Sequence, residues 1–402
     1  MVKREKYLEK LRQLRDMNVI KIVTGVRRSG KSTLLNQFRQ ELRETGVGNK
    51  NIQTFNLEER ENQGFIKTPD LLYDTIIERC EKNQQNYVFI DEIQMIPGFE
   101  MIVDSLFVKD DIDLYITGSN AYMTSSELAT LLSGRYVEIK MQPLTFAEFI
   151  QFFPNDADKF SRFQQFMRYG GFPEVANFLA GGAEGQIPLY LQGIYDTVLE
   201  KDIKLRKQIR SMEDFRNVAR FTFDNIGSIS SPTNISNVLR QDNQVVARQT
   251  VDNYLIALQD CYIIYKASRF DIRGKKLLQT LEKYYAVDLG LVDTVLGRPS
   301  NADLGHRLEN VVYLELLSRY GKVWVGKNYE KEIDFVVKNS DGITEYFQVS
   351  QSVIDRDTLK REAGAFENTG DNYRRTLLTL DMFDTDESGI ERRNVVDWLL
   401  ES

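Results

Sequence analysis

Hydrophobic residues in the first 140 positions fall into short runs that are separated by polar segments. Five segments have the composition of β-strands: residues 19–23, 51–57, 87–92, 113–120 and 136–140. Residues 69–82 instead carry apolar side chains at helical spacing, and a helix is expected to begin after residue 32. Strands that alternate with helices predict a parallel α/β sheet in this part of the chain.

The first predicted strand leads into residues 25–32, GVRRSGKS, which match the pattern G-x-x-x-x-G-K-[ST]. Glycines let backbone N–H groups approach a β-phosphate, and the following helix N-terminus favours negative charge. Lys31 is expected to reach the β- and γ-phosphates, and the Ser32 hydroxyl to hold Mg²⁺. The predicted nucleotide-binding residues are Gly25, Val26, Arg27, Arg28, Ser29, Gly30, Lys31, Ser32 and Thr33.

The strand at residues 87–92 buries apolar residues and then presents two carboxylates, Asp91 and Glu92. Ligands of parallel sheets bind at the carboxyl ends of the strands, so these acids are expected beside the glycine loop. Asp91 is predicted to hold Mg²⁺ through a water molecule, and Glu92 to orient and deprotonate the attacking water. An acid at the position of Glu92 suits hydrolysis of the nucleotide.

Residues 113–120 form a further strand that ends in small polar residues. Ser119 or Asn120 is expected to contact both the γ-phosphate and the attacking water, and Asn120 is counted among the catalytic candidates. This strand and the acid pair indicate the branch of P-loop proteins in which an extra strand separates the loop strand from the carboxylate strand.

The sequence allows more than one role for each of three arginines. Arg135 is a candidate for stabilising charge on the transferred phosphoryl group, in cis or across a subunit interface. The alternative is an ordinary ion pair with a nearby carboxylate. Arg27 and Arg28 within the loop face the phosphates, a partner protein or solvent.

Six motifs resemble those of the bacterial and archaeal AAA-type ATPases of the fourteenth AAA class: residues 25–32, 87–94, 117–120, 132–135, 170–174 and 305–310. The resemblance spans roughly residues 19–352. It implies an ATPase domain followed by that family's C-terminal domain of unknown function. The motifs are specific for nucleotide binding and say nothing about biological purpose.

Composition narrows the class of protein further. The chain has 402 residues, of which 42% are hydrophobic and 28% charged, as expected for two or three globular domains. No apolar run is long enough to cross a membrane, and two distant cysteines favour a reduced, cytoplasmic setting. A single histidine argues against a Ser-His-Asp hydrolase, and the net charge of −7 argues against general coating of DNA. The guanine-recognition motif Asn-Lys-x-Asp is absent, which favours ATP.

The predicted ATPase domain covers residues 1–142, and residues 143–214 are expected to form a helical lid or linker that includes a long helix at 187–210. Residues 215–295 resemble a winged helix, with its third helix at 247–260 and a basic hairpin at 269–275. In a DNA-binding winged helix the third helix enters the major groove and the wing touches the backbone. The candidate DNA-contacting residues are Arg248, Gln249 and Asn253. A protein-binding module or an ATPase lid is the alternative.

Residues 296–402 resemble the PD-(D/E)XK nuclease core. Glu309 on a helix and Asp334 after a strand match two of its acids, but the E-x-K positions hold Gln348 and Ser350. Because that chemistry needs a second metal-binding acid and a lysine, an inherited nuclease fold without nuclease activity is predicted.

The fold class predicted overall is α/β: a P-loop sheet of the AAA type, then a winged helix, then a nuclease-like domain. The predicted function is an ATP-hydrolysing switch that uses ATP and Mg²⁺ and engages double-stranded DNA or a protein partner. A homo-oligomer is left open and a membrane role is not expected. The alternatives are a nucleotide-binding adaptor with negligible turnover and a DNA-processing enzyme with residual nuclease activity.

Overall fold

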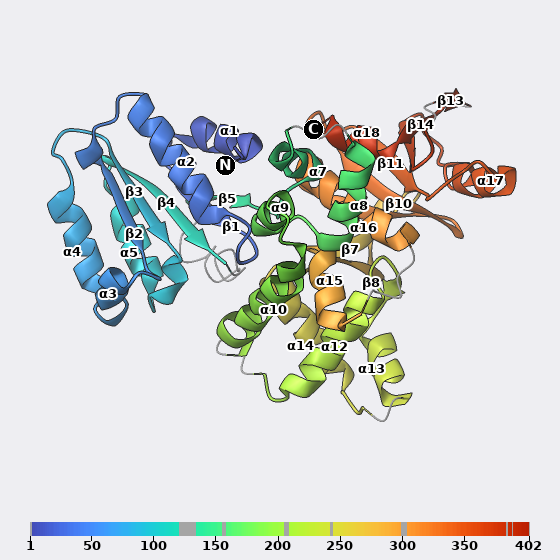
Figure 1. Ribbon diagram of the computed structural model, residues 1–402, viewed down its shortest axis with the longest axis horizontal. Helices are drawn as coiled ribbons and strands as arrows, with labels where there is room; N and C mark the ends of the chain where they lie inside the picture. Colours follow the sequence, from blue (N-terminus) through green and yellow to red (C-terminus); the bar gives the residue numbers. More distant parts are fainter. Residues whose placement is uncertain are drawn as a thin grey trace. The chain divides into compact units, whose positions relative to one another are not determined.

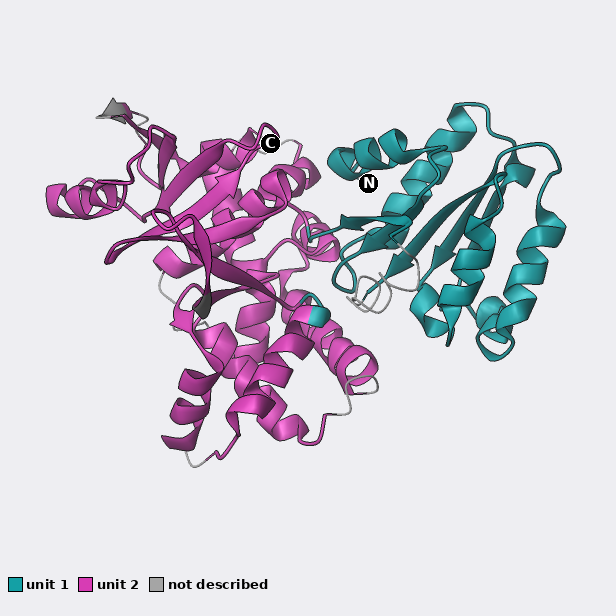
Figure 2. Cartoon of the chain, turned by 180° about the vertical axis from the view of Figure 1, so that it is seen from behind, with its two compact units in different colours: residues 1–143, 260–262 teal, residues 144–259, 263–402 magenta. Residues whose placement is uncertain are grey.

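The computed structural model describes these residues: 2–119, 134–154, 158–204, 209–241, 244–298, 304–382, 385–387 and 389–401. The chain divides into two compact units, which Figure 2 shows in different colours. One unit comprises residues 1–143 with 260–262, and the other comprises residues 144–259 with 263–402.

The first unit is built on a five-stranded parallel sheet (Figure 1). Its strands are β1 (Ile20–Thr24), β2 (Ile52–Asn56), β3 (Asn86–Asp91), β4 (Ile112–Gly118) and β5 (Tyr136–Lys140). Their order across the sheet is β2-β3-β4-β1-β5. β4 therefore separates the loop strand β1 from the carboxylate strand β3, and the prediction of an intervening strand is confirmed.

Helices cover both faces of this sheet: α1 (Glu5–Leu14), α2 (Lys31–Glu44), α3 (Gln63–Lys67), α4 (Pro69–Arg79) and α5 (Phe99–Phe107). On one face α1 and α2 pack into a core in which Phe38 contacts Phe89 and Tyr115. On the other face α4 and α5 pack against Ile22 and Ile90. Because the strands are buried on both faces, they read as continuous apolar runs in the sequence.

The second unit contains a nine-stranded mixed sheet, in the order β13-β14-β12-β11-β10-β9-β7-β8-β6. The strands are β6 (Ile229–Ser230), β7 (Ile264–Asp271), β8 (Lys276–Ala286), β9 (Val323–Asn328), β10 (Lys331–Lys338), β11 (Thr344–Val349), β12 (Arg374–Thr379), β13 (Thr385–Glu387) and β14 (Ile390–Asn394). β7 and β8 form the hairpin expected as a wing, and β7 also pairs in parallel with β9. The hairpin is thus continuous with the strands expected in the nuclease-like region.

The longer helices of the second unit are α8 (Lys159–Tyr169), α9 (Pro173–Ala180), α10 (Ile187–Thr197), α12 (Met212–Asp224), α13 (Pro232–Gln241), α14 (Arg248–Asp260), α15 (Leu289–Leu296), α16 (Leu304–Tyr320) and α17 (Arg356–Gly364); the short helices are α7 (Phe146–Phe149) and α18 (Val395–Leu400). The single helix expected at residues 187–210 is interrupted, because α10 ends at Thr197 and a π-helix follows at Val198–Lys204. The wider turn keeps Val198, Leu199 and Ile203 buried.

The glycine pair at residues 170 and 171 has a structural explanation. The Asp288 carboxylate accepts hydrogen bonds from the backbone N–H groups of Gly171, at 2.6 Å, and Leu291, at 2.9 Å. Gly170 has a φ of +82°, and a Cβ there would lie 2.1 Å from Asp288 Oδ1. Only glycine allows this approach, so the motif fastens the start of α9 to the start of α15.

Candidate active site

The loop between β1 and α2 has the backbone geometry of a phosphate cradle. Gly25 and Gly30 adopt positive φ angles of 144° and 102°. A Cβ on Gly25 would lie 2.0 Å from the carbonyl oxygen of Met141, so this position excludes every other residue. Lys31 is the first residue of α2, and its buried Nζ donates to the carbonyl oxygens of Gly25 and Val26 at 3.0 and 3.1 Å.

The residues of this loop fit a nucleotide polyphosphate. The first N–H groups of an α-helix have no partner within the helix, so the start of α2 offers donors to an anion. The buried Ser29 Oγ has no hydrogen-bond partner in the described structure, so it is a further donor available to a ligand. Lys31 is held by neutral carbonyl oxygens, which it can exchange for phosphate oxygens.

Asp91, at the end of β3, lies beside the start of α2. Its Oδ1 accepts a hydrogen bond from the Thr117 hydroxyl, and its carboxylate lines the same cavity as Ser32. Burial raises the pKa of Asp91, and the hydroxyls of Ser32 and Thr117 partly oppose that rise. A carboxylate next to a hydroxyl fits Mg²⁺, which takes few protein ligands and completes its shell with phosphate and water oxygens.

Glu92 follows directly and is held by neighbouring side chains. It has a φ of +56°, and its backbone N–H donates to Thr117 Oγ1 at 3.0 Å. Its Oε2 accepts from Ser119 Oγ at 3.0 Å and from the Gln94 side-chain amide. Burial raises the pKa of Glu92, but the charges of Lys31 and Arg27 together with the two hydrogen bonds outweigh burial and bring it below its ordinary value. Glu92 is therefore an ionised acceptor at neutral pH.

The loop arginines differ in their surroundings. Arg27 Nη1 donates to Glu58 Oε1 at 3.1 Å, and its Nη2 lies 4.0 Å from Glu92 Oε2. Arg28 is exposed and has a positive φ of 65°. Arg27 thus faces the predicted catalytic acid, which the sequence did not reveal.

Among the described residues, the predicted catalytic residue Arg135 is not brought to this site. Arg135 immediately precedes β5, which runs parallel to β1. Arg135 therefore lies at the amino-terminal ends of the strands, whereas the loop lies at their carboxyl ends. Its Nη1 forms an ion pair with Asp104 at 2.7 Å, the ordinary alternative expected from sequence. A role within the same chain is therefore disfavoured, and a role across subunits stays a prediction. Asn120 lies outside the described residues.

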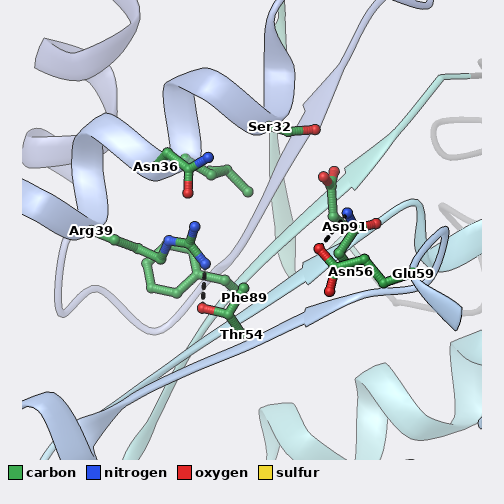
Figure 3. Close-up of a pocket in the computed structure, with 9 residues that line it drawn as sticks. Ser32, Asn36, Arg39, Thr54, Asn56, Glu59, Phe89 and Asp91 are labelled. Carbon is green, nitrogen blue, oxygen red and sulfur yellow. Dashed lines mark hydrogen bonds between the residues drawn. The ribbon is translucent and has the colours of Figure 1, made fainter. Parts of the chain in front are cut away.

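A small cavity next to the predicted Mg²⁺ site escaped the sequence analysis (Figure 3). It extends from Ser32 and Asp91 along α2 to Arg39, and Asn56 and Glu59 from the end of β2 also line it. Sequence spacing offered one signal, because Ser32, Asn36 and Arg39 share one face of a helix.

The acids of the region expected to resemble a nuclease form a different kind of cluster in the second unit. Lys283 on β8 lies 2.9 Å from Glu309 Oε1 and 2.8 Å from Glu332 Oε1, and Tyr285 also donates to Glu309 at 2.6 Å. Burial raises the pKa of Asp334 well above its ordinary value, and the charge of Glu309 adds to the rise. Sequence analysis missed Lys283, because it comes from a strand outside the motif.

Gln348 and Ser350, which occupy the E-x-K positions, make local hydrogen bonds. The Gln348 amide oxygen accepts from the backbone of Asp334, and its nitrogen donates to Glu362. Ser350 Oγ donates to the carbonyl oxygen of Ser352. Among the described residues, no group of three or more acidic, histidine or cysteine side chains is arranged to hold a metal ion.

The candidate DNA-contacting residues lie on the surface of α14. Arg248, Gln249 and Asn253 are exposed. The basic hairpin is partly engaged elsewhere, since Arg273 donates to the carbonyl oxygen of Asn368 at 2.9 Å and stacks on the Tyr329 ring at 4.0 Å.

The sheet order and the loop geometry define a P-loop ATPase fold of the AAA type. A family model described as an AAA domain matches residues 17–150, and a model described as a domain of unknown function (DUF8612) matches residues 161–302. A Walker-type ATPase of Pyrococcus abyssi has a similar solved structure, with a TM-score of 0.51 and 15% identity over 73% of this chain and 96% of that chain. At this identity the similarity shows the fold alone.

Two relatives match along almost the whole chain. An uncharacterised protein of Haemophilus influenzae is 39% identical over 100% of this chain and 99% of its own length. An uncharacterised protein of Methanocaldococcus jannaschii is 26% identical over 94% of this chain and 85% of its own length. The chain therefore belongs to the family of the Haemophilus protein, and in this chain an AAA domain precedes a domain of unknown function. In the part of the chain that is described, no helix is both long and apolar enough to span a bilayer.

Proposed function

We propose that this protein is an ATP-hydrolysing switch. The observation that carries the proposal is the meeting of Lys31, Ser32, Asp91 and Glu92 at one edge of the sheet. Two segments hold the acid pair in place, since Thr117 and Ser119 lie at the end of β4 and Gln94 follows β3. Such fixed geometry is what hydrolysis requires, because catalysis of phosphoryl transfer is mostly positioning and electrostatics.

In the proposed mechanism ATP binds with its phosphates against the loop, and Lys31 exchanges the carbonyls of Gly25 and Val26 for phosphate oxygens. Ser32 would hold Mg²⁺ directly and Asp91 would hold it through a water molecule, and the ion would neutralise phosphate charge when bound. Glu92 orients a water molecule and accepts its proton as the water oxygen bonds to the γ-phosphorus and the bond from the γ-phosphorus to the bridging oxygen breaks.

The remaining parts of the chain are proposed to bind their partner differently when ATP or ADP occupies the first unit. We assign residues 1–142 to the ATPase domain, 143–214 to a helical lid or linker, 215–295 to a winged helix and 296–402 to a nuclease-like domain. The winged helix engages double-stranded DNA through the exposed face of α14, or a protein partner through the same surface. Arg135 acts across subunits if the protein forms a homo-oligomer.

The nuclease-like region is proposed to be catalytically inactive. Glu309 is neutralised by Lys283 and further bound by Tyr285, and Asp334 accepts from the backbone of Val349 at 2.8 Å. These carboxylates therefore already have partners within the protein. A lysine bound to acids in this way is a poor activator of water, because two of its three N–H donors are already directed at carboxylates.

The test of hydrolysis is Glu92→Gln. This change keeps the size and hydrogen bonds of the side chain but removes the proton acceptor, so ATP binding is retained while turnover falls about 10²-fold or more. Glu58→Gln is the matched control, since Glu58 also contacts Arg27 but is exposed. Steady-state phosphate release and nucleotide affinity are measured for both variants.

Parental turnover in the Glu92→Gln variant would refute the assigned base. Tight retention of ADP during purification, with no turnover in the parent protein, would favour the adaptor without hydrolysis. Capture of partners by the ATP-bound Glu92→Gln protein would then identify what the switch engages.

DNA engagement predicts a steep salt dependence. Phosphate contacts release counterions, so the affinity of the whole protein for a DNA duplex should fall steeply between about 50 and 200 mM salt. Arg248→Gln should weaken binding and reduce the salt slope by about one contact. No cleavage is expected with Mg²⁺ or Mn²⁺. Binding that is insensitive to salt would point to a protein partner, and cleavage abolished by Asp334→Asn would show that the nuclease-like region is active.

A further inference from the structure

The cavity beside the predicted Mg²⁺ site has a volume of about 160 Å³ and two chemically different ends. Figure 3 shows Arg39 and Asn36 at one end, and Asp91, Asn56 and Glu59 at the other. Ser32, which lines the cavity together with Asp91, lies where the cavity meets the nucleotide loop. A group that enters this cavity from the loop would pass from the acids toward the arginine.

Arg39 is a cation with an unfilled hydrogen-bonding position. Its guanidinium lies 5.7 Å from the centre of the Phe89 ring, and Nη1 donates to Thr54 Oγ1. Its Nε is buried and has no acceptor among the residues that the structure describes. A buried N–H without a partner costs free energy, and an anion in the cavity would remove that cost.

The surroundings of Arg39 favour an anion over a neutral ligand. Burial lowers the pKa of Arg39 and the neighbouring Arg43 lowers it further, while the charges of Asp91 and Glu59 in the same cavity oppose the fall. Arg39 remains protonated, and neither carboxylate forms an ion pair with it in the described structure. Asn36 adds a neutral side-chain amide that is able to donate to an oxyanion.

The acidic end suits the same ligand when a metal accompanies it. Asp91 and Glu59 alone would repel an anion. The cavity nevertheless places donors at one end and oxygen ligands for Mg²⁺ at the other, which is the arrangement that a metal-bound phosphate requires. The cavity can therefore hold the Mg²⁺ ion and the phosphate without a rearrangement of the sheet.

We propose that this cavity binds the inorganic phosphate released by hydrolysis, with Arg39 as its main ligand and Asn36 as a second one. The inference rests on the proposed ATPase function and extends it to the path of the product. Phosphate held here lies beside Ser32 and Asp91, so its departure determines when the loop returns to its nucleotide-free state. The same tetrahedral oxyanion chemistry is present in the phosphate ester of a small acceptor molecule, and the test separates these two sources.

The test is equilibrium dialysis of radiolabelled inorganic phosphate against the full-length protein, with Mg²⁺ and ADP present. Arg39→Gln should weaken phosphate binding by at least about tenfold, the scale of one charge-assisted hydrogen bond. Arg43→Gln is the matched control, because Arg43 lies one turn further along α2, is exposed and donates to Asn49. Its phosphate affinity should equal that of the parent.

A second variant guards against effects on folding. Asn36→Asp changes one exposed side chain to an isosteric anion, so phosphate binding should weaken while the thermal midpoint stays within about 2 °C, as for most surface changes. ADP affinity is measured for all variants and should change less than twofold. Parental phosphate affinity in both Arg39→Gln and Asn36→Asp would overturn the proposal.

Two further measurements separate the possible explanations. Glycerol 2-phosphate that displaces radiolabelled phosphate at lower concentration than unlabelled phosphate would assign the cavity to a phosphorylated acceptor, and would overturn the product assignment. A parent protein that binds no ADP or ATP would refute the proposed function instead. Phosphate dialysis with Mg²⁺ alone would still show whether Arg39 holds an oxyanion.

Discussion

The two units of this protein each contain a buried lysine among carboxylates, and the two lysines are held differently. Lys31 in the nucleotide loop donates to backbone carbonyl oxygens, while Asp91 and Glu92 nearby are held by hydroxyl and amide groups. Lys283 in the second unit donates directly to Glu309 and Glu332. A lysine on neutral oxygens can exchange them for a phosphate, whereas a lysine on carboxylates is already neutralised and links elements of the fold.

The largest effect is expected from removing the structural lysine. Lys283→Met leaves Glu309 and Glu332 without the cation that both contact, and breaking a buried pair by removing one partner costs about 3–5 kcal/mol of stability. Lys266→Met is the control, because its ion pair with Glu282 is more exposed and is worth at most about 1 kcal/mol. Urea denaturation measures both. An unchanged stability in Lys283→Met would remove the distinction between the two lysines.

Lys31, the lysine proposed to bind nucleotide, should affect nucleotide affinity more than stability. Lys31→Ala removes one cation together with its phosphate hydrogen bonds, so nucleotide binding should fall at least about 10²-fold, to below detection in a titration. The nucleotide-free protein should lose less stability than in Lys283→Met, since the hydrogen bonds of Lys31 to Gly25 and Val26 go to neutral carbonyl oxygens, although its charge also lowers the pKa of Glu92. Strong destabilisation with nucleotide affinity retained would reverse the roles of Lys31 and Lys283.

A third buried acid, Asp288, extends the comparison because it forms no ion pair with any residue that the structure describes. Burial raises the pKa of Asp288 to about 6, against the N–H groups of Gly171, Leu291 and Gly290. Between about pH 4 and 6, Asp288 is therefore protonated in the folded protein and ionised in the unfolded chain. The contribution of Asp288 to the free energy of unfolding should fall by about 2 kcal/mol as pH rises from 4.5 to 7.

Urea denaturation across this range, with Asp288→Asn as the comparison, isolates the effect. The variant should lack this component of the pH dependence, and the difference in stability between the two proteins should be constant above about pH 7. A parent and a variant with parallel pH profiles would show that Asp288 is ionised in the folded state throughout.

Contiguous motifs explain why much of the first unit could be predicted. The loop at residues 25–32 and the acid pair at 91 and 92 each lie within one short segment, and the polar end of β4 indicated its place between β1 and β3. Residues contributed by separate elements could not be predicted. Arg39 meets Thr54 and Phe89 only through packing of α2 on the sheet, and Lys283 reaches Glu309 only because β8 lies beneath α16.

Strand pairing over long sequence separations could not be predicted from the local sequence pattern either. The hairpin at residues 269–275 reads locally as a wing, and nothing in its own residues reveals that β7 pairs with β9 some 55 residues later (269 with 325). The π-helix after α10 was missed for a related reason, because the extra residue in its turn follows from the packing of Ile203.

The pairing of β7 with β9 limits how this protein can be divided. The matched domain of unknown function ends at residue 302, between α15 and α16, whereas the sheet that it contains continues through β9 to β13. A fragment cut at that boundary would carry β7 with an open edge at Arg269–Asp271, and such an edge recruits strands from other molecules. The hairpin and the C-terminal strands therefore form one sheet. A truncated gene or an exchanged domain has to include both segments.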